Sequence, residues 1–181
     1  MLDLSKAIKE SEEVYYTEEK LISLSRRDIY LLIELAKSTS RRRVRLCCHS
    51  SLDDTLHEMV IVHEKNTYVR PHKHLNKTES MTVLLGEADY VTFSQDGEIT
   101  EVLTLGDPRS EHTFFQTIRD ERFHTLLVRS DWLAFVETTK GPFKKEDNVD
   151  AKWSPPSKEE KEVQSFLESL IKKVDKYKLD A

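Results

Sequence analysis

The feature that most constrains the fold is a series of short β-prone runs, one directly after another, between residues 44 and 138. Each run is rich in β-branched and aromatic residues and is bounded by polar turns, and no helical period interrupts the series. Asp96-Gly97 between two alternating runs is a strong hairpin signal. The expected strands are residues 44–49, 56–63, 68–74, 80–85, 88–93, 98–103, 113–118, 124–128 and 132–138. Strands joined by such short connections pair antiparallel, so the sequence predicts a mainly β fold: a sandwich, a jelly roll or a barrel.

Apolar residues at helical spacing lie on both sides of this series. Ser25 with Asp28 three residues later is a capping pattern, which predicts a helix from residue 25 to about residues 37–40. Ser157 and Glu160 form a second capping pattern ahead of a longer helix. The apolar stripe of that helix consists of Val163, Phe166, Leu167, Leu170, Ile171, Val174 and Tyr177. Two ways of covering the stripe stay open: packing on the β domain, or pairing with a second copy of the chain as a homodimer.

These patterns divide the 181 residues into three parts. Residues 1–43 are expected to form an N-terminal arm and a helix that pack on the barrel, and residues 10–19 favour a short strand or an extended conformation. Residues 44–153 are expected to form the β-barrel itself. Residues 154–181 are expected to form an amphipathic helix.

Charge and hydropathy argue against several partners. The net charge is -5 with acidic and basic residues interspersed, so nothing favours binding to nucleic acid or to an anionic membrane. No apolar run approaches the roughly 18–20 residues that span a bilayer. Residues 1–6 lack the pattern of a secretory signal, and a cytoplasmic protein is expected. The adjacent Cys47 and Cys48 would point to opposite faces of a strand as reduced thiols.

One stretch carries the clearest chemical signal. His72 and His74 are two residues apart, Glu79 follows five residues after His74, and Gly86 ends an apolar run. Because residues i and i+2 of a strand point to the same face, the two imidazoles can enter one cavity, where a carboxylate from the next strand can join them. Imidazole and carboxylate donors predict a divalent metal ion, with Zn, Fe, Mn and Ni all suited to the set.

The spacing of these four residues matches the first sequence motif of the cupin superfamily. The resemblance implies a jelly-roll β-barrel that holds its metal with three histidines and one glutamate. The third histidine would come from a second motif, where this sequence has neither the usual Pro nor the usual Gly before His124 and has Val128 in place of an Asn. A strand, a polar turn and another strand surround His124, which favours it over His112 as the remaining ligand.

Further segments are similar to the WbuC-type cupin-fold metalloproteins, which occur with bacterial surface-polysaccharide genes. The similarity covers roughly residues 40–156 and is carried by residues 43–49, 68–74, 137–143 and 151–155. It implies a small-molecule ligand related to sugars.

Four other residues are candidates for the chemistry around the metal. His49 could carry a proton or support a ligand, and Glu137 could be a general acid or base, or else form an ion pair with a nearby arginine. Arg70 and Lys140 are candidate anion contacts at the barrel mouth.

Three functions follow from this site, and the sequence leaves open whether the protein is an enzyme. The first is a metal-dependent enzyme acting on a sugar or nucleotide sugar by isomerase- or epimerase-like Lewis-acid chemistry. The second is a dioxygenase that uses Fe, Ni or Mn. The third is a non-catalytic cupin that binds a small ligand.

Overall fold

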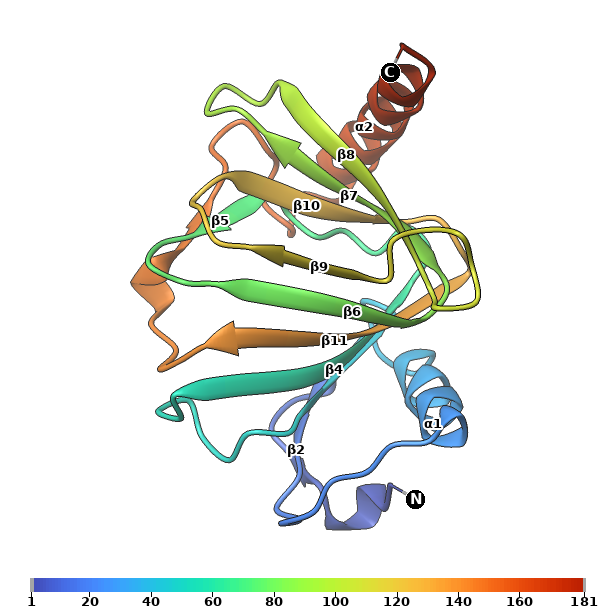
Figure 1. Ribbon diagram of the computed structural model, residues 1–181, viewed down its shortest axis with the longest axis vertical. Helices are drawn as coiled ribbons and strands as arrows, with labels where there is room; N and C mark the ends of the chain where they lie inside the picture. The colour runs from blue at the N-terminus through green and yellow to red at the C-terminus, as the bar shows by residue number, and fades with distance from the viewer. Residues whose placement is uncertain (1, 181) are drawn as a thin grey trace.

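The computed structural model describes residues 2–180 and contains two β-sheets with a helix at each end of the molecule (Figure 1). The first sheet has seven strands in the order β1-β2-β3-β4-β11-β6-β9, and the second has five in the order β12-β5-β10-β7-β8. The strands are β1 (Ile8–Lys9), β2 (Val14–Tyr16), β3 (Arg43–Cys47), β4 (Leu56–Glu64), β5 (His72–His74), β6 (Glu79–Leu85), β7 (Glu87–Phe93), β8 (Ile99–Gly106), β9 (Phe115–Ile118), β10 (Phe123–Val128), β11 (Trp132–Lys140) and β12 (Asn148–Asp150).

The main core lies between the two sheets. Met81 of β6 and Phe135 of β11 pack in one cluster with Tyr90 of β7 and Leu126 of β10, and all four side chains are buried. Because side chains alternate along a strand, the inward residues of each strand line the interior in steps of two. The chain therefore has the two-layer arrangement that the strand series predicts, with its hydrogen bonds distributed over two sheets.

Every predicted run contains a strand, and the differences lie at the strand ends. The predicted strand 68–74 is reduced to β5, because Pro71 has no N–H to donate to a neighbouring strand. β1 and β12 were not predicted, since two or three residues are too few to show an alternating pattern. β2 lies within the arm and pairs in parallel with β3, so the arm extends the first sheet.

Helix α1 (Arg26–Ala36) covers the outer face of the first sheet. The Ser25 N–H donates to the Asp28 carboxylate over 2.7 Å, which caps the first turn as the sequence pattern predicts. Ile29 and Leu32 pack against Val44 of β3 and Val62 of β4. Because Val44 faces this helix, its neighbours Arg43 and Arg45 face the opposite side, towards the interior.

Helix α2 (Glu160–Asp180) packs on the outer face of the second sheet, at the opposite end of the molecule from α1 (Figure 1). Its seven stripe residues are buried or half-buried, and the rest of the helix is exposed. Leu170 and Val174 contact Val91 and Phe123 in one cluster. In this structure the β domain therefore covers the stripe.

Ion pairs add to this docking. The Asp89 carboxylate of β7 is fully buried and accepts hydrogen bonds from Arg129 over 2.6 Å and from Lys178 of α2 over 2.9 Å. Arg129 also reaches Asp175 of the helix over 2.7 Å. Within residues 2–180, neither helix combines the length and apolar character needed to cross a bilayer.

Two substitutions in α2 test its docking. Leu170→Ala should lower the free energy of unfolding by about 2–5 kcal/mol, because it leaves a cavity against the second sheet. Leu179→Ala makes the same change at a position that is 87% exposed, and its effect should stay within about 0.5 kcal/mol. Urea titration followed by circular dichroism measures both. Equal effects of the two substitutions would contradict the docked position.

Candidate metal centre

Three histidines and one glutamate from the two facing sheets meet in the interior. β5 supplies His72 and His74, and β10 pairs antiparallel with β5 so that His124 lies directly opposite His72. Glu79 is the first residue of β6 and belongs to the other sheet. The group therefore joins the two layers, with its imidazoles on one side and its carboxylate on the other.

The distances suit a shared ion. One ring nitrogen from each of His72, His74 and His124 lies within 4.8 Å of the other two. The two oxygens of Glu79 face different imidazoles: Oε2 is 2.9 Å from His74 Nε2, and Oε1 is 3.8 Å from His124 Nε2. Glu79 and His124 are buried, and His72 and His74 are half-buried.

Carbonyl oxygens hold each imidazole in place. His72 Nδ1 donates to the Arg70 carbonyl over 2.7 Å, and His124 Nδ1 donates to the Arg122 carbonyl over 3.2 Å. His74 Nδ1 lies 2.6 Å from the side-chain oxygen of Asn148 on β12. An oxygen that only accepts requires the proton on Nδ1, which leaves the Nε2 lone pair free for a metal.

The inward nitrogens show that a metal fits. Nε2 of His74 and Nε2 of His124 are buried and have no hydrogen-bond partner within residues 2–180. His74 Nε2 lies close to Glu79 Oε2, but the two atoms do not meet the angles of a hydrogen bond. Buried polar atoms rarely stay without a partner, and three imidazoles with a carboxylate are a common donor set for transition metals. The four residues could hold the divalent ion that the sequence predicts.

Electrostatic interactions keep most of the donors in the protonation state that binds a metal ion. Burial lowers the pKa of His72, and it lowers the pKa of His124 to about 4, so both are neutral at pH 7. Burial opposes ionisation of Glu79, but the contact with His74 and the other imidazoles lower its pKa overall. Burial also opposes protonation of His74, but Glu79 raises its pKa, so a proton competes with a metal there.

A small cavity of about 80 Å³ adjoins these residues, and we call it the metal cavity. Its lining consists of Ile61, His63, Val69, His72, Glu79, Met81, Tyr90, His124, Thr125, Leu126, Phe135 and Glu137. Burial and the neighbouring Glu79 charge raise the pKa of Glu137, which favours a carboxyl that can hold a proton near neutral pH. Burial lowers the pKa of His63 to about 3, so this imidazole is neutral.

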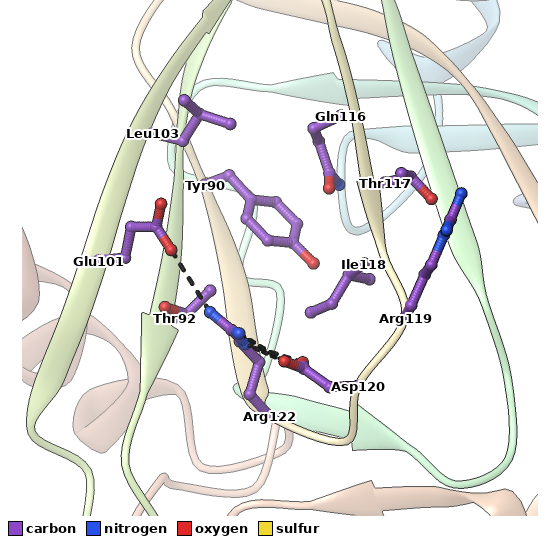
Figure 2. A pocket seen from close by; sticks show the side chains of 10 residues that line it. All are labelled: Tyr90, Thr92, Glu101, Leu103, Gln116, Thr117, Ile118, Arg119, Asp120 and Arg122. Atoms are coloured by element: carbon purple, nitrogen blue, oxygen red, sulfur yellow. Dashed lines mark hydrogen bonds and ion pairs between the residues drawn. The ribbon is translucent and has the colours of Figure 1, made fainter.

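Two larger cavities share lining residues with the metal cavity. The first, the Tyr90 pocket of about 380 Å³, is drawn in Figure 2 and shares only Tyr90, whose ring stacks on His124 at 5.3 Å. The Tyr90 hydroxyl and the Gln116 amide nitrogen are buried there without hydrogen-bond partners in the described chain. The second, the arginine cavity of about 330 Å³, shares Ile61, His63, Val69, His72 and Glu137.

The structure separates some predicted residues from this centre. His49 stacks on His57 at 4.1 Å, its Nδ1 lies 3.2 Å from the Glu58 carbonyl oxygen, and it does not line the metal cavity. His112, the rival of His124, is exposed near Gly106 at the end of β8. His124, which the strand pattern favours, is the histidine that lies opposite His72.

The two predicted anion contacts lie outside the three cavities. Arg70 directs its guanidinium to Asp150 over 2.8 Å and to Ser154 over 3.2 Å, which ties the start of β5 to the segment after β12. Lys140 is exposed at the end of β11. Neither geometry supports a substrate contact, and those roles stay predictions.

Sequence reasoning missed Asn148, Tyr90 and Arg45. Asn148 is more than seventy residues from His74, and only the pairing of β12 with β5 brings them together. In the sequence, Tyr90 and Arg45 are indistinguishable from ordinary strand residues. The alternation along β3, with Val44 and Leu46 apolar, was the one signal that Arg45 faces the interior.

Comparisons with known proteins support the fold. Residues 24–105 match the model of a family described as a domain of unknown function (DUF6016), which includes His72, His74 and Glu79 but ends before His124. None of the curated proteins matches the sequence. A Klebsiella pneumoniae protein with a double-stranded β-helix domain aligns over 75% of this chain and 93% of its own, with 14% identity and a TM-score of 0.52. The chain therefore has a double-stranded β-helix fold.

More distant structural matches cover parts of longer chains. Bacillus subtilis oxalate decarboxylase aligns over 54% of this chain and 24% of its own, with 18% identity and a TM-score of 0.42. A sugar phosphate isomerase of the cupin superfamily from Silicibacter pomeroyi aligns over 49% and 52%, with 14% identity and a TM-score of 0.38. The chain thus spans about a quarter and about half of the lengths of these two proteins. The resemblance to WbuC-type proteins stays a prediction.

The choice between His124 and His112 is open to direct test. Protein purified without a His tag should carry about one metal ion per chain, and His124→Ala should lose most of it, because an intact structural shell needs all its donors. His112→Ala should keep the wild-type content, and His72→Ala should match His124→Ala. Elemental analysis by mass spectrometry measures each. If His112→Ala loses metal and His124→Ala keeps it, the assignment is wrong.

A second prediction concerns Asn148. Asn148→Ala removes the acceptor that fixes the His74 ring, so metal affinity should fall about 10–100-fold. Asn148→Asp keeps an oxygen at the same position and should restore most of the affinity. Competition against a chromophoric chelator measures both. Equal affinities for wild type and Asn148→Ala would show that the Asn148 contact does not orient the ring.

Proposed function

We propose that this protein is a metal-dependent enzyme that acts on a sugar or nucleotide sugar by isomerase- or epimerase-like proton transfer. One observation carries the proposal: a protonatable carboxyl, Glu137, lines the same cavity as His72 and His124 of the three-histidine group. A proton carrier beside a Lewis-acid site is what proton transfer next to a carbonyl requires. A place in surface-polysaccharide biosynthesis is part of the proposal and is supported by the sequence resemblance alone.

The chain's residues have separate tasks in this reaction. His72, His74, His124 and Glu79 would hold a divalent ion, which supplies a Lewis acid able to polarise a carbonyl oxygen. Glu137, in its ionised form, would take the proton from the carbon beside that carbonyl, and the protonated Glu137 would return it to the neighbouring position or to the other face. Ile61, Val69 and Phe135 line the cavity with apolar groups that keep water from this proton.

The position of Glu137 supports this assignment. It lies on β11 opposite Met81 of β6 and Met59 of β4, so its carboxyl faces the interior one step along the sheet from Glu79. Glu137 has no ion pair or side-chain hydrogen bond in the described part of the chain, which supports a proton carrier over the arginine pair that the sequence left open. A carboxyl without such a partner is free to exchange a proton with a substrate.

Replacing Glu137 tests the proposal. Glu137→Gln should lower kcat/KM by about a hundredfold or more, the typical contribution of general acid–base catalysis, while the metal content stays unchanged. Deuterium uptake from D2O at the carbon beside the carbonyl, followed by proton NMR over a panel of sugars and nucleotide sugars, is the assay. Glu58→Gln on the exposed face of β4 is the matched control and should match wild type. The proposal fails if the metal-loaded protein neither exchanges nor binds any member of the panel.

A further inference from the structure

We propose that the arginine cavity binds the anionic group of the substrate, a phosphate or carboxylate, with Arg45 as its main contact. The inference rests on the proposed function, because it takes the metal cavity as the place where the substrate reacts. It adds that the substrate is an anion whose charged end points towards the N-terminal arm.

The arginine cavity adjoins the metal cavity. Five residues line both, among them His72 and Glu137. The rest of its lining comes from the arm and from the first residues of β3, including Ser11, Glu13 and Val14. Its volume of about 330 Å³ matches the low end of small-molecule sites, roughly 300–1,000 Å³. A ligand held there would contact residues that also line the metal cavity.

Of the three arginines that line the arginine cavity, one has no ion-pair partner within residues 2–180. Its lining holds Arg41, Arg43 and Arg45 against the carboxylates of Glu13 and Glu137. Glu13 is buried and is engaged with Arg41 at 2.6 Å and with Arg43 at 2.9 Å. Glu137 forms no ion pair with any of the three arginines within residues 2–180.

Arg45 is the remaining cation. Its Nε is buried without a hydrogen-bond partner, and its guanidinium forms no ion pair within residues 2–180. A buried donor without an acceptor is costly, and a planar guanidinium suits the paired oxygens of a phosphate or carboxylate. An anionic ligand would supply the missing acceptor.

The register of β3 holds Arg45 at this place. Arg45 pairs with Ile61 of β4, and Ile61 lines both the arginine cavity and the metal cavity. Val44 and Leu46 on either side are buried beneath α1. Turning Arg45 away from the interior would expose both apolar neighbours, so the fold fixes its direction.

The Tyr90 pocket is a weaker candidate for the same anion. Figure 2 shows Arg122 between Asp120 and Glu101, and its pair with Glu101 spans 3.4 Å, so carboxylates already neutralise it. Arg119 is exposed at the same pocket. Because this pocket shares only Tyr90 with the metal cavity, a ligand bound by Arg119 would contact fewer residues of the metal cavity.

Calorimetry with inorganic phosphate, acetate and a sugar phosphate tests the site, on metal-free and metal-loaded protein. Arg45→Met should raise the Kd of the favoured anion about tenfold or more in both forms, since one charge-assisted hydrogen bond is worth about that factor. Arg119→Met should bind like wild type. Tighter binding of phosphate than acetate assigns a phosphorylated substrate, and the reverse assigns a carboxylate. Wild-type affinity in Arg45→Met, or weakened binding only in Arg119→Met, overturns the proposal.

A second variant should change the anion affinity in the opposite direction. Glu13→Gln removes the carboxylate that engages Arg41 and Arg43, so anion affinity should rise; a Kd equal to or above that of wild type contradicts the proposal. Unfolding curves and metal content of each variant exclude a loss of fold as the cause.

The same measurements distinguish a failure of this anion site from a failure of the proposed function. Arg45-dependent binding of an anion without any deuterium exchange would retain the site and refute the function. Deuterium exchange with an anionic substrate whose KM is unchanged in Arg45→Met would retain the function and refute the site. Equal affinities for a sugar phosphate and its neutral parent sugar would also refute the site.

Discussion

The antiparallel pairing of β5 with β10 is the constraint on which the candidate site depends. It sets His124 opposite His72, while the alternation within β5 brings His74 to the same face. A shift of one residue in either strand would turn that strand's imidazole to the other face of the sheet. The facing sheet then needs to supply only one carboxylate, Glu79, and the packing between the sheets brings it within 2.9 Å of His74.

Burial and hydrogen bonding act together on these donors. Burial alone disfavours a charge on any of them, which keeps His72 and His124 neutral and would also keep Glu79 protonated. The imidazoles reverse that tendency at Glu79, whereas Glu137 has no such contact and its pKa is raised. Two carboxyls on neighbouring strands of one sheet thus differ in the direction of their pKa shifts, as the proposed roles of a metal ligand and a proton carrier require.

The sequence predicted the parts of this arrangement that depend on local pattern. Strand periodicity located every long strand, and the spacing of His72, His74 and Glu79 identified a donor group that the structure brings together. It could not reveal Asn148 as a partner of His74, because a three-residue strand far along the chain has no periodic signature. The prediction for Arg70 had the same weakness: whether an arginine faces a ligand or a carboxylate such as Asp150 depends on distant neighbours.

The N-terminal arm shows how a peripheral element can determine the charge of an interior cavity. The backbone of Glu13 accepts a hydrogen bond from the Arg45 N–H over 2.7 Å, and β2 then continues beside β3. This attachment fixes the Glu13 carboxylate beside Arg41 and Arg43 and leaves the Arg45 side chain outside its reach. The arm therefore engages Arg41 and Arg43 and leaves Arg45 without an ion pair in the part of the chain that the structure describes.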